Sequence, residues 1–405
     1  MESELLKEAR QLQVWRKSDH PKMQTASIWG EVLALRLSKK RQVRKAARVK
    51  RFLDALVLDL WVASTCEDNP WRSVSRDKSD YQKEGRYRKI FFKYDLFIPL
   101  LDDLISLGYV DQKKGYQNMG NQKMSYQSRI MATDKLLASC TEWDIQHVVQ
   151  ADDVPLSDVI RLRDKDKRLI DYEDSERTIE MRARLDQYNA QLGGSKLSVE
   201  GVKADTSMKR MHRVFNNSSF EKGGRFYGGF WQGLRQRQFM QRQQLRIDDE
   251  EVTELDFKSL HPSFLYRLKE LPVPEDAYSI EGVDRQSVKD AFLVIVNCDS
   301  RKQALDTMRH EKGIKDAESV LAAIECKHSQ LSEFFFLGED ALGLQHMDSL
   351  LADAIMKDLY AEGIVVLPIH DSFIVAKKNE GRLREVMIDW YYDFFGVVPL
   401  IDKKY

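Results

Sequence analysis

The stretch TELDFKSLHPSFLY, residues 253–266, decides the fold that we expect for this chain. It reads as a β-strand that ends near Asp256, followed by a turn and a helix. A second stretch, VVLPIHDSFIV at residues 365–375, reads as a β-hairpin with His370 and Asp371 at its tip. We therefore expect an antiparallel sheet that carries one aspartate on each of two neighbouring strands.

Two carboxylates on neighbouring strands suit a particular chemistry. They can bridge two Mg²⁺ ions about 3.5–4 Å apart, one activating an attacking 3′-hydroxyl and the other neutralising a triphosphate. Asp256 and Asp371 are thus predicted to be the catalytic metal ligands, with Mg²⁺ as cofactor and Mn²⁺ as a substitute. Taken singly, Asp256 could equally be a strand-end aspartate and Asp371 part of an ordinary turn.

A basic pair lies between the two aspartates along the chain. In RQSVKDAFLVIVN, residues 285–297, Arg285 and Lys289 are four residues apart and share one face of the expected helix. Such a pair can bind a triphosphate, or it can be a solvated surface pair.

The two aspartate motifs resemble those of known polymerases. LDFKSLHPS is similar to motif A of the replicative polymerases, closest in wording to family B. IHDSF is similar to motif C of family A DNA polymerases and of the single-subunit phage and mitochondrial RNA polymerases. The resemblance covers roughly residues 205–380 and implies a right-hand polymerase. It assigns triphosphate binding to the basic pair and nucleic-acid contacts to Arg225 (after Gly223 and Gly224), Gln345 and His370.

Two positions bear on nucleotide selection. Eight residues beyond Lys289 the family has a tyrosine or phenylalanine against the nascent base pair, whereas this chain has Asn297. Five residues beyond Asp256 the DNA polymerases carry a bulky residue that excludes a 2′-hydroxyl, and here that residue is His261. We therefore expect both to lie at the nucleotide, and His261 favours DNA over RNA as the product.

The N-terminal region, 1–140, is expected to be mostly helical and to bind nucleic acid. A helix ending at Gly108, two β-leaning pieces and a polar tip resemble a winged helix, although a structural helix–hairpin unit fits equally. The run from Arg36 to Arg51 contains no acid, which favours phosphate contact over a solvated helix face. The residues predicted to bind phosphate are Lys39, Lys40, Arg41, Arg44 and Lys45.

Two further regions complete the expected organisation. Residues 141–200 include a long mixed-charge stretch, 159–194, predicted to be helical and thumb-like. Residues 201–405 are expected to form the palm, with short fingers inserted at about 275–345. The predicted fold class is α+β: an antiparallel palm sheet, helical fingers and thumb, and a winged-helix-like N-terminal domain.

Composition argues against a disulfide-rich protein, a cysteine-bound metal site and a membrane protein. The 405 residues include 64 basic and 64 acidic side chains, so a nucleic-acid footprint depends on how charge is distributed. The four cysteines are far apart and form neither a metal motif nor a disulfide framework. No apolar run approaches the roughly 20 residues that span a bilayer. We expect a cytoplasmic protein without a membrane partner.

Together these features predict template-directed nucleotidyl transfer, with a nucleic-acid template and primer and nucleoside triphosphates as partners. DNA polymerase activity is preferred. The alternatives are an RNA polymerase or primase-like enzyme of the same fold, a winged-helix DNA-binding replication factor with an inactive palm, and a metal-dependent nuclease that uses the same acids.

Overall fold

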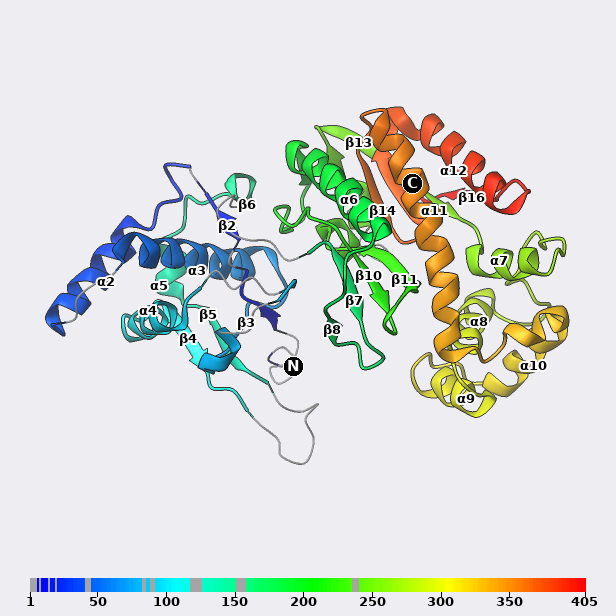
Figure 1. Ribbon diagram of the computed structural model, residues 1–405, viewed down its shortest axis with the longest axis horizontal. Coiled ribbons are helices and arrows are strands. Elements are labelled where there is room, and N and C mark those ends of the chain that lie inside the picture. The colour runs from blue at the N-terminus through cyan, green and yellow to red at the C-terminus, as the bar shows by residue number, and fades with distance from the viewer. Residues whose placement is uncertain are drawn as a thin grey trace. The chain divides into compact units, whose positions relative to one another are not determined.

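The chain forms two compact units, residues 1–158 with 199–209, and residues 159–198 with 210–405 (Figure 1). The computed structural model describes all residues except 1–5, 7–8, 14, 19, 41–44, 82–84, 88–91, 117–125, 151–157 and 235–239. Each unit is described by itself. The three-region division 1–140, 141–200 and 201–405 stays a prediction.

The first unit packs helices against a four-stranded sheet of order β1-β3-β5-β4. Helix α3 is its centre, because residues such as Phe52, Leu53 and Leu56 along it are fully buried. The strands are β1 (Arg10–Gln11), β2 (Arg16–Lys17), β3 (Arg72–Val74), β4 (Val110–Lys113), β5 (Ser128–Ala132) and β6 (Val149–Gln150). The helices are α2 (Ala26–Ser38), α3 (Ala46–Cys66), α4 (Tyr94–Ser106), α5 (Asp134–Ala138) and the 3₁₀ turns η1 (Lys78–Tyr81) and η3 (Ile145–His147).

The helix and the β-leaning pieces expected near Gly108 are present. Helix α4 ends just before Gly108, which has a φ of 75° that suits glycine. Strands β4 and β5 then pair antiparallel, and the Thr133 side chain accepts a hydrogen bond that caps α5. The tip of the expected hairpin, 117–125, lies outside the described residues. The winged helix itself stays a prediction.

The basic run is divided between two helices. Helix α2 ends at Ser38 and α3 begins at Ala46, and Lys39, Lys40 and Lys45 between them are exposed. Arg41 and Arg44 lie outside the described residues. The first arginine of the run is not available to phosphate, because the buried Arg36 donates to an Asp103 oxygen at 2.6 Å.

The second unit contains two sheets. One has the order β14-β15-β13-β12-β9 with β16 also on β13, and the other the order β11-β10-β7-β8. The strands are β7 (Ile160–Arg163), β8 (Leu169–Ile170), β9 (Leu197–Val199), β10 (His212–Asn216), β11 (Ser219–Tyr227), β12 (Leu245–Ile247), β13 (Glu250–Phe257), β14 (Val366–Ile369), β15 (Ser372–Ala376) and β16 (Ile401–Lys403). The pairs of β13 with β12, β15 and β16, and of β14 with β15, are antiparallel, as expected.

Helices surround these sheets, and α11 runs from the α8–α10 group towards the β13 sheet (Figure 1). They are α6 (Glu176–Gly194), α7 (Leu260–Leu268), α8 (Arg285–Asn297), α9 (Arg301–His310), α10 (Ala317–Lys327), α11 (Leu342–Ala361) and α12 (Glu380–Phe395). Short 3₁₀ turns are η4 (Phe230–Gly233), η5 (Gln241–Gln244), η6 (Ser329–Phe334), η7 (Gly338–Ala341) and η8 (Lys377–Asn379). The α+β class is confirmed. Among the described residues, no helix is long and apolar enough to cross a membrane.

The prediction of one helical stretch over 159–194 is wrong for its first part. Only α6, ending at Gly194, is helical, whereas Ile160–Arg163 and Leu169–Ile170 form β7 and β8. In β7, buried Ile160 and Leu162 alternate with half-buried arginines, which is the two-residue period of a strand. Parallel pairing with β10 stabilises this conformation, and charge composition alone did not reveal it.

Gly223 and Gly224 have a structural reason to be glycine. Both lie within β11 with positive φ values, 78° and 94°. A Cβ on Gly224 would lie 2.7 Å from the Phe215 ring and 2.8 Å from the Ser349 hydroxyl of α11. Gly224 therefore lets α11 pack closely on this sheet, whereas a Cβ on Gly223 would overlap the Asn216 side chain within the sheet.

Candidate active site

The fold brings Asp256 and Asp371 together, from motifs more than a hundred residues apart. In the antiparallel pair of β13 and β15, Asp256 is in register with Ser372, the residue after Asp371. The Phe257 amide also donates to the Asp371 carbonyl at 3.4 Å. The two aspartates therefore lie side by side at one end of the sheet, as predicted from their motifs.

The two carboxylates repel one another. Burial, followed by the charge of Asp256, raises the pKa of Asp371 to about 6. Burial also raises the pKa of Asp256, against the lowering effects of Lys404 and Lys289. Paired anions in a partly desolvated place are stabilised by a proton or by a cation.

A lysine already contacts one of them. Lys404 Nζ lies 2.5 Å from Asp256 Oδ2, and strand β16 places Asp402 in register with Asp256 on the side opposite β15. Burial lowers the pKa of Lys404, but its hydrogen bond to Asp256 outweighs burial and the pKa is raised overall. No sequence pattern pointed to Lys404, because nothing local connects residues 401–404 with β13.

His370 shapes the hairpin that carries Asp371. Its φ of 59° is uncommon outside glycine and allows the two-residue connection between β14 and β15. Its ring lies edge-on to Tyr227, with centroids 5.5 Å apart, and burial lowers the pKa of His370 to about 4. Nδ1 of His370 is buried and has no hydrogen-bond partner within the described residues.

Helix α8 presents the basic pair as expected, but its two members differ. Arg285 is exposed and forms an ion pair with Asp276 at 2.7 Å, above the ring of buried Tyr278. Lys289 forms no ion pair in the part of the chain that the structure describes, and its charge lowers the pKa of Asp256. Of these two residues, therefore, only Lys289 has a positive charge that is not paired with an acid among the described residues and that acts on Asp256.

Asn297 and Gln345 are not brought to the carboxylates by any contact between described residues. Asn297 ends α8, is exposed, and donates its side-chain amide to the Leu293 carbonyl at 2.8 Å. Gln345 is half-buried in the first turns of α11. Their nucleotide and minor-groove roles stay predictions.

Arg225 and His261 meet at an acid that the sequence analysis missed. Asp348 of α11 has a fully buried side chain that accepts from Arg225 Nε at 3.0 and 3.1 Å. His261 Nε2 lies 3.0 Å from Asp348 Oδ2. Asp348 comes three residues after Gln345 on the same helix, so helical spacing could have drawn attention to it.

This group lies next to the paired aspartates. The negative charge of Asp348 contributes to raising the pKa of Asp371, whereas His261 and Arg225 lower it. Lys39, Lys40 and Lys45 belong to the first unit, and their role in binding nucleic acid stays a prediction.

Comparisons with known proteins add little. No protein-family model matches the chain, and no curated protein matches its sequence. Among solved structures, the chain is similar to the POL domain of Pol1 from M. smegmatis in complex with DNA primer-template and dNTP. The identity is 11% and the TM-score 0.30, with 93% of this chain and 65% of that chain covered. So weak a similarity carries no argument about this chain.

Proposed function

We propose that this protein catalyses template-directed nucleotidyl transfer, with DNA as its preferred product, at Asp256 and Asp371. The observation that supports this most is the pair itself: two carboxylates on adjacent strands, both with a pKa raised by burial, of which Asp371 is raised further by the charge of Asp256. If the two aspartates had only a structural role, each would be expected to have a cationic partner, because unpaired buried charges destabilise a fold.

The residues fit Mg²⁺ by the chemistry of their donors. Mg²⁺ is commonly held by one or two carboxylates, with water and substrate phosphates as the remaining ligands. Asp256 and Asp371 supply those carboxylates, and no larger cluster of three or more His, Cys, Asp or Glu ligands occurs among the described residues. When bound, two such ions would activate a 3′-hydroxyl and neutralise the triphosphate.

The remaining side chains have roles that follow from their charge. Lys289, close enough to lower the pKa of Asp256, would hold the triphosphate, and Arg285 would join it by exchanging Asp276 for phosphate. Lys404 partly neutralises Asp256 in the free protein and keeps the two carboxylates compatible. In this proposal β12–β16 form the palm, residues 275–345 the fingers and α6 the thumb.

Nucleic acid would be bound by each unit through its own residues. We propose that Lys39, Lys40 and Lys45, with Arg41 and Arg44, contact phosphate, and that the winged-helix-like part of the first unit binds duplex. His370 and Gln345 would contact the primer–template beside Asp371. Arg225 would act at the duplex only through Asp348, since its guanidinium is bound there.

Primer extension tests the proposal. Purified protein is incubated with Mg²⁺ and each combination of DNA or RNA template with deoxy- or ribonucleotides. Asp256→Ala and Asp371→Ala should each lower incorporation by about a thousandfold or more, since metal-positioned charge supplies most of the barrier reduction. Glu251→Gln, an exposed acid on the same strand β13, is the matched control and should retain wild-type rates.

The outcomes separate the competing functions. Activity within about tenfold of wild type in either aspartate variant overturns the two-metal assignment. Shortening of the labelled primer indicates a nuclease, and duplex binding without incorporation indicates a binding factor with an inactive palm. A wild-type preference for ribonucleotides makes RNA the product and leaves nucleotidyl transfer in place.

A further inference from the structure

We infer that Asp348 is a positioning residue that holds the His261 ring at the candidate active site, and that this contact determines which nucleotide sugar the protein accepts. The inference rests on the proposed function and adds a residue to it. It begins from the three-way contact of Asp348, His261 and Arg225.

The contact determines the tautomer of His261. Burial raises the pKa of Asp348, but the hydrogen bonds from His261 and Arg225 outweigh burial and lower the pKa overall, so Asp348 is ionised. An ionised carboxylate only accepts hydrogen bonds. Nε2 of His261 must therefore carry the proton and donate it to Asp348 Oδ2, 3.0 Å away.

The contact also determines the orientation of the ring. Arg225 Nη2 lies 3.3 Å from His261 Nε2, and both nitrogens donate to the same oxygen of Asp348. Rotating the imidazole by about 180° would break its hydrogen bond to Asp348, and the carboxylate would lose one of its donors. A buried charge that loses a hydrogen bond is destabilised, so the ring stays in place.

In the proposed function, the His261 ring lies against the sugar of the incoming nucleotide. His261 follows β13 in the first turn of α7, five residues after Asp256, and Asp348, which it contacts, raises the pKa of Asp371. A ring that cannot rotate away excludes an additional hydroxyl more strongly than a free one does. Sugar selection would then depend on Asp348 as much as on His261.

The test compares Asp348→Asn with Asp353→Asn, using kcat/KM and KM for deoxy- and ribonucleotides. Asp353 is a matched control, because it lies on the same helix and also pairs with two arginines, Arg184 at 2.9 Å and Arg213 at 3.0 Å. An asparagine at 348 offers one oxygen to donors that need two, which releases the ring. We expect the deoxy-to-ribo ratio of kcat/KM to fall by about tenfold or more in Asp348→Asn.

The fall should arise mainly from a lower ribonucleotide KM, and Asp353→Asn should leave the ratio unchanged. In a His261→Ala background, adding Asp348→Asn should change the ratio by less than about twofold, because Asp348 acts through the histidine. An equal loss for both sugars, or a ratio that still changes without His261, overturns the inference. If Asp348→Asn does not fold, Asp348→Glu keeps the charge and displaces the carboxylate.

A readout without turnover separates this inference from the proposed function. The ¹⁵N spectrum of the histidine rings, assigned with His261→Ala, should show a single Nε2-protonated tautomer in the wild type and a mixture in Asp348→Asn. If no nucleotide is incorporated, the proposed function fails and this spectrum still reports on the ring. A freely exchanging tautomer in the wild type, or a wild type that prefers ribonucleotides, overturns the inference.

Discussion

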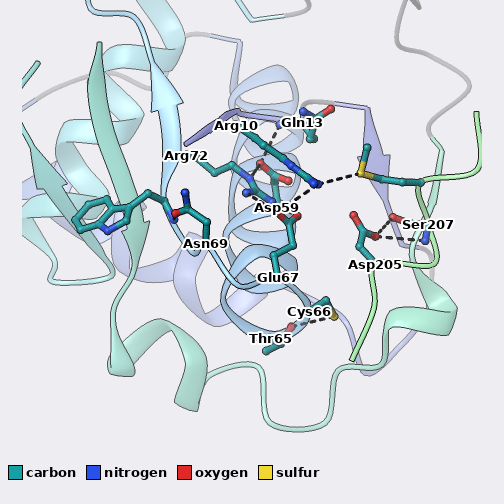
Figure 2. A network of polar contacts seen from close by, with 12 residues as sticks. Arg10, Gln13, Asp59, Thr65, Cys66, Glu67, Asn69, Arg72, Asp205 and Ser207 are labelled. Carbon is teal, nitrogen blue, oxygen red and sulfur yellow. Dashed lines mark hydrogen bonds and ion pairs between the residues drawn. The ribbon is translucent and has the colours of Figure 1, made fainter. Parts of the chain in front are cut away.

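Each unit contains a group of buried charges, and the two groups are organised in opposite ways. In the first unit, Arg16 contacts Asp59 and Asp205, while Arg72 lies 3.0 Å from Asp59 and 2.5 Å from Glu67. We call these five residues the Arg16 network, and Figure 2 shows Asp59, Glu67, Arg72 and Asp205 of it. Every acid in it has an arginine partner.

The paired aspartates of the second unit have the reverse arrangement. Among the described residues, Asp256 pairs with Lys404 and Asp371 has no ion pair, and the charge of Asp256 raises the pKa of Asp371. Mutual neutralisation serves structure, since a satisfied buried network stabilises one arrangement of the chain. Unneutralised charge disfavours the folded state and is expected where a ligand supplies the missing charge.

The Arg16 network also has a clear architectural task. Asp205 belongs to the segment 199–209, which follows α6 and β9 and returns to the first unit. Ser207 donates to Asp205 at 2.5 Å, and Asp205 meets the fully buried guanidinium of Arg16. The network therefore attaches the returning segment to the unit in which the chain begins.

The largest effect that would distinguish the two groups is on stability. Asp59→Asn should destabilise the first unit by about 3–5 kcal/mol, because it leaves two buried arginines without their shared acid. Asp371→Asn should cause no loss, since it removes a repelled charge. Hydrogen exchange of amides in α3 and β13 reports each unit separately.

Asp111→Asn, an exposed position on β4, is the control for the first unit and should be neutral. A loss below about 1 kcal/mol in Asp59→Asn would mean that the Arg16 network is not needed for folding.

The second expected effect is on pH dependence. The pKa of Asp371 is raised from 3.8 to about 6, so between these values the folded protein binds a proton that the unfolded chain has lost. Stability should therefore fall as pH rises through this interval, by up to about 3 kcal/mol. Asp371→Asn should lack this contribution, and urea unfolding across the interval measures the difference between the two proteins.

Comparing the two proteins matters because other groups oppose the trend. Burial lowers the pKa of His328 and of His370 to about 4, so their contribution to stability falls as pH falls. These terms are common to wild type and variant. Identical pH profiles for the two would show that Asp371 is not held in a repulsive environment.

The third effect is that of Mg²⁺ on the second unit. Mg²⁺ should stabilise the wild type by about 1–3 kcal/mol at concentrations well above its Kd, because it binds the folded site and not the unfolded chain. The midpoint of thermal unfolding, measured with and without Mg²⁺ at matched ionic strength, tests this. Equal stabilisation of Asp371→Asn would place the metal elsewhere.

The smallest effect concerns the exposed charges of the first unit. Replacing Lys39, Lys40, Arg41, Arg44 and Lys45 by glutamine should leave stability unchanged and flatten the salt dependence of DNA binding. Each lost phosphate contact lowers the log–log slope by about 0.9. Titrations at several salt concentrations measure this slope, and an unchanged value would identify the run as an ordinary solvated surface.

The sequence by itself determined the local elements that carry the site. The strand at Asp256, the hairpin at Asp371 and the helix with Arg285 and Lys289 follow from short-range periodicity and turn chemistry, which neighbouring residues specify. The α+β class followed from the same patterns. Strands β7 and β8 were missed, because their mixed charge also suits a helix and only pairing with β10 distinguishes the two.

Only the tertiary structure decided which side chains meet. Arg225 reaches Asp348 across 123 residues and His261 reaches it across 87, while Lys404, the residue after β16, contacts Asp256 on β13. Such contacts depend on how α7, α11, β11 and β16 pack, and this packing produces no periodic pattern in the sequence. A fully buried acid like Asp348 is recognised as important only when its partners are in view, because its burial is tolerated through their charges.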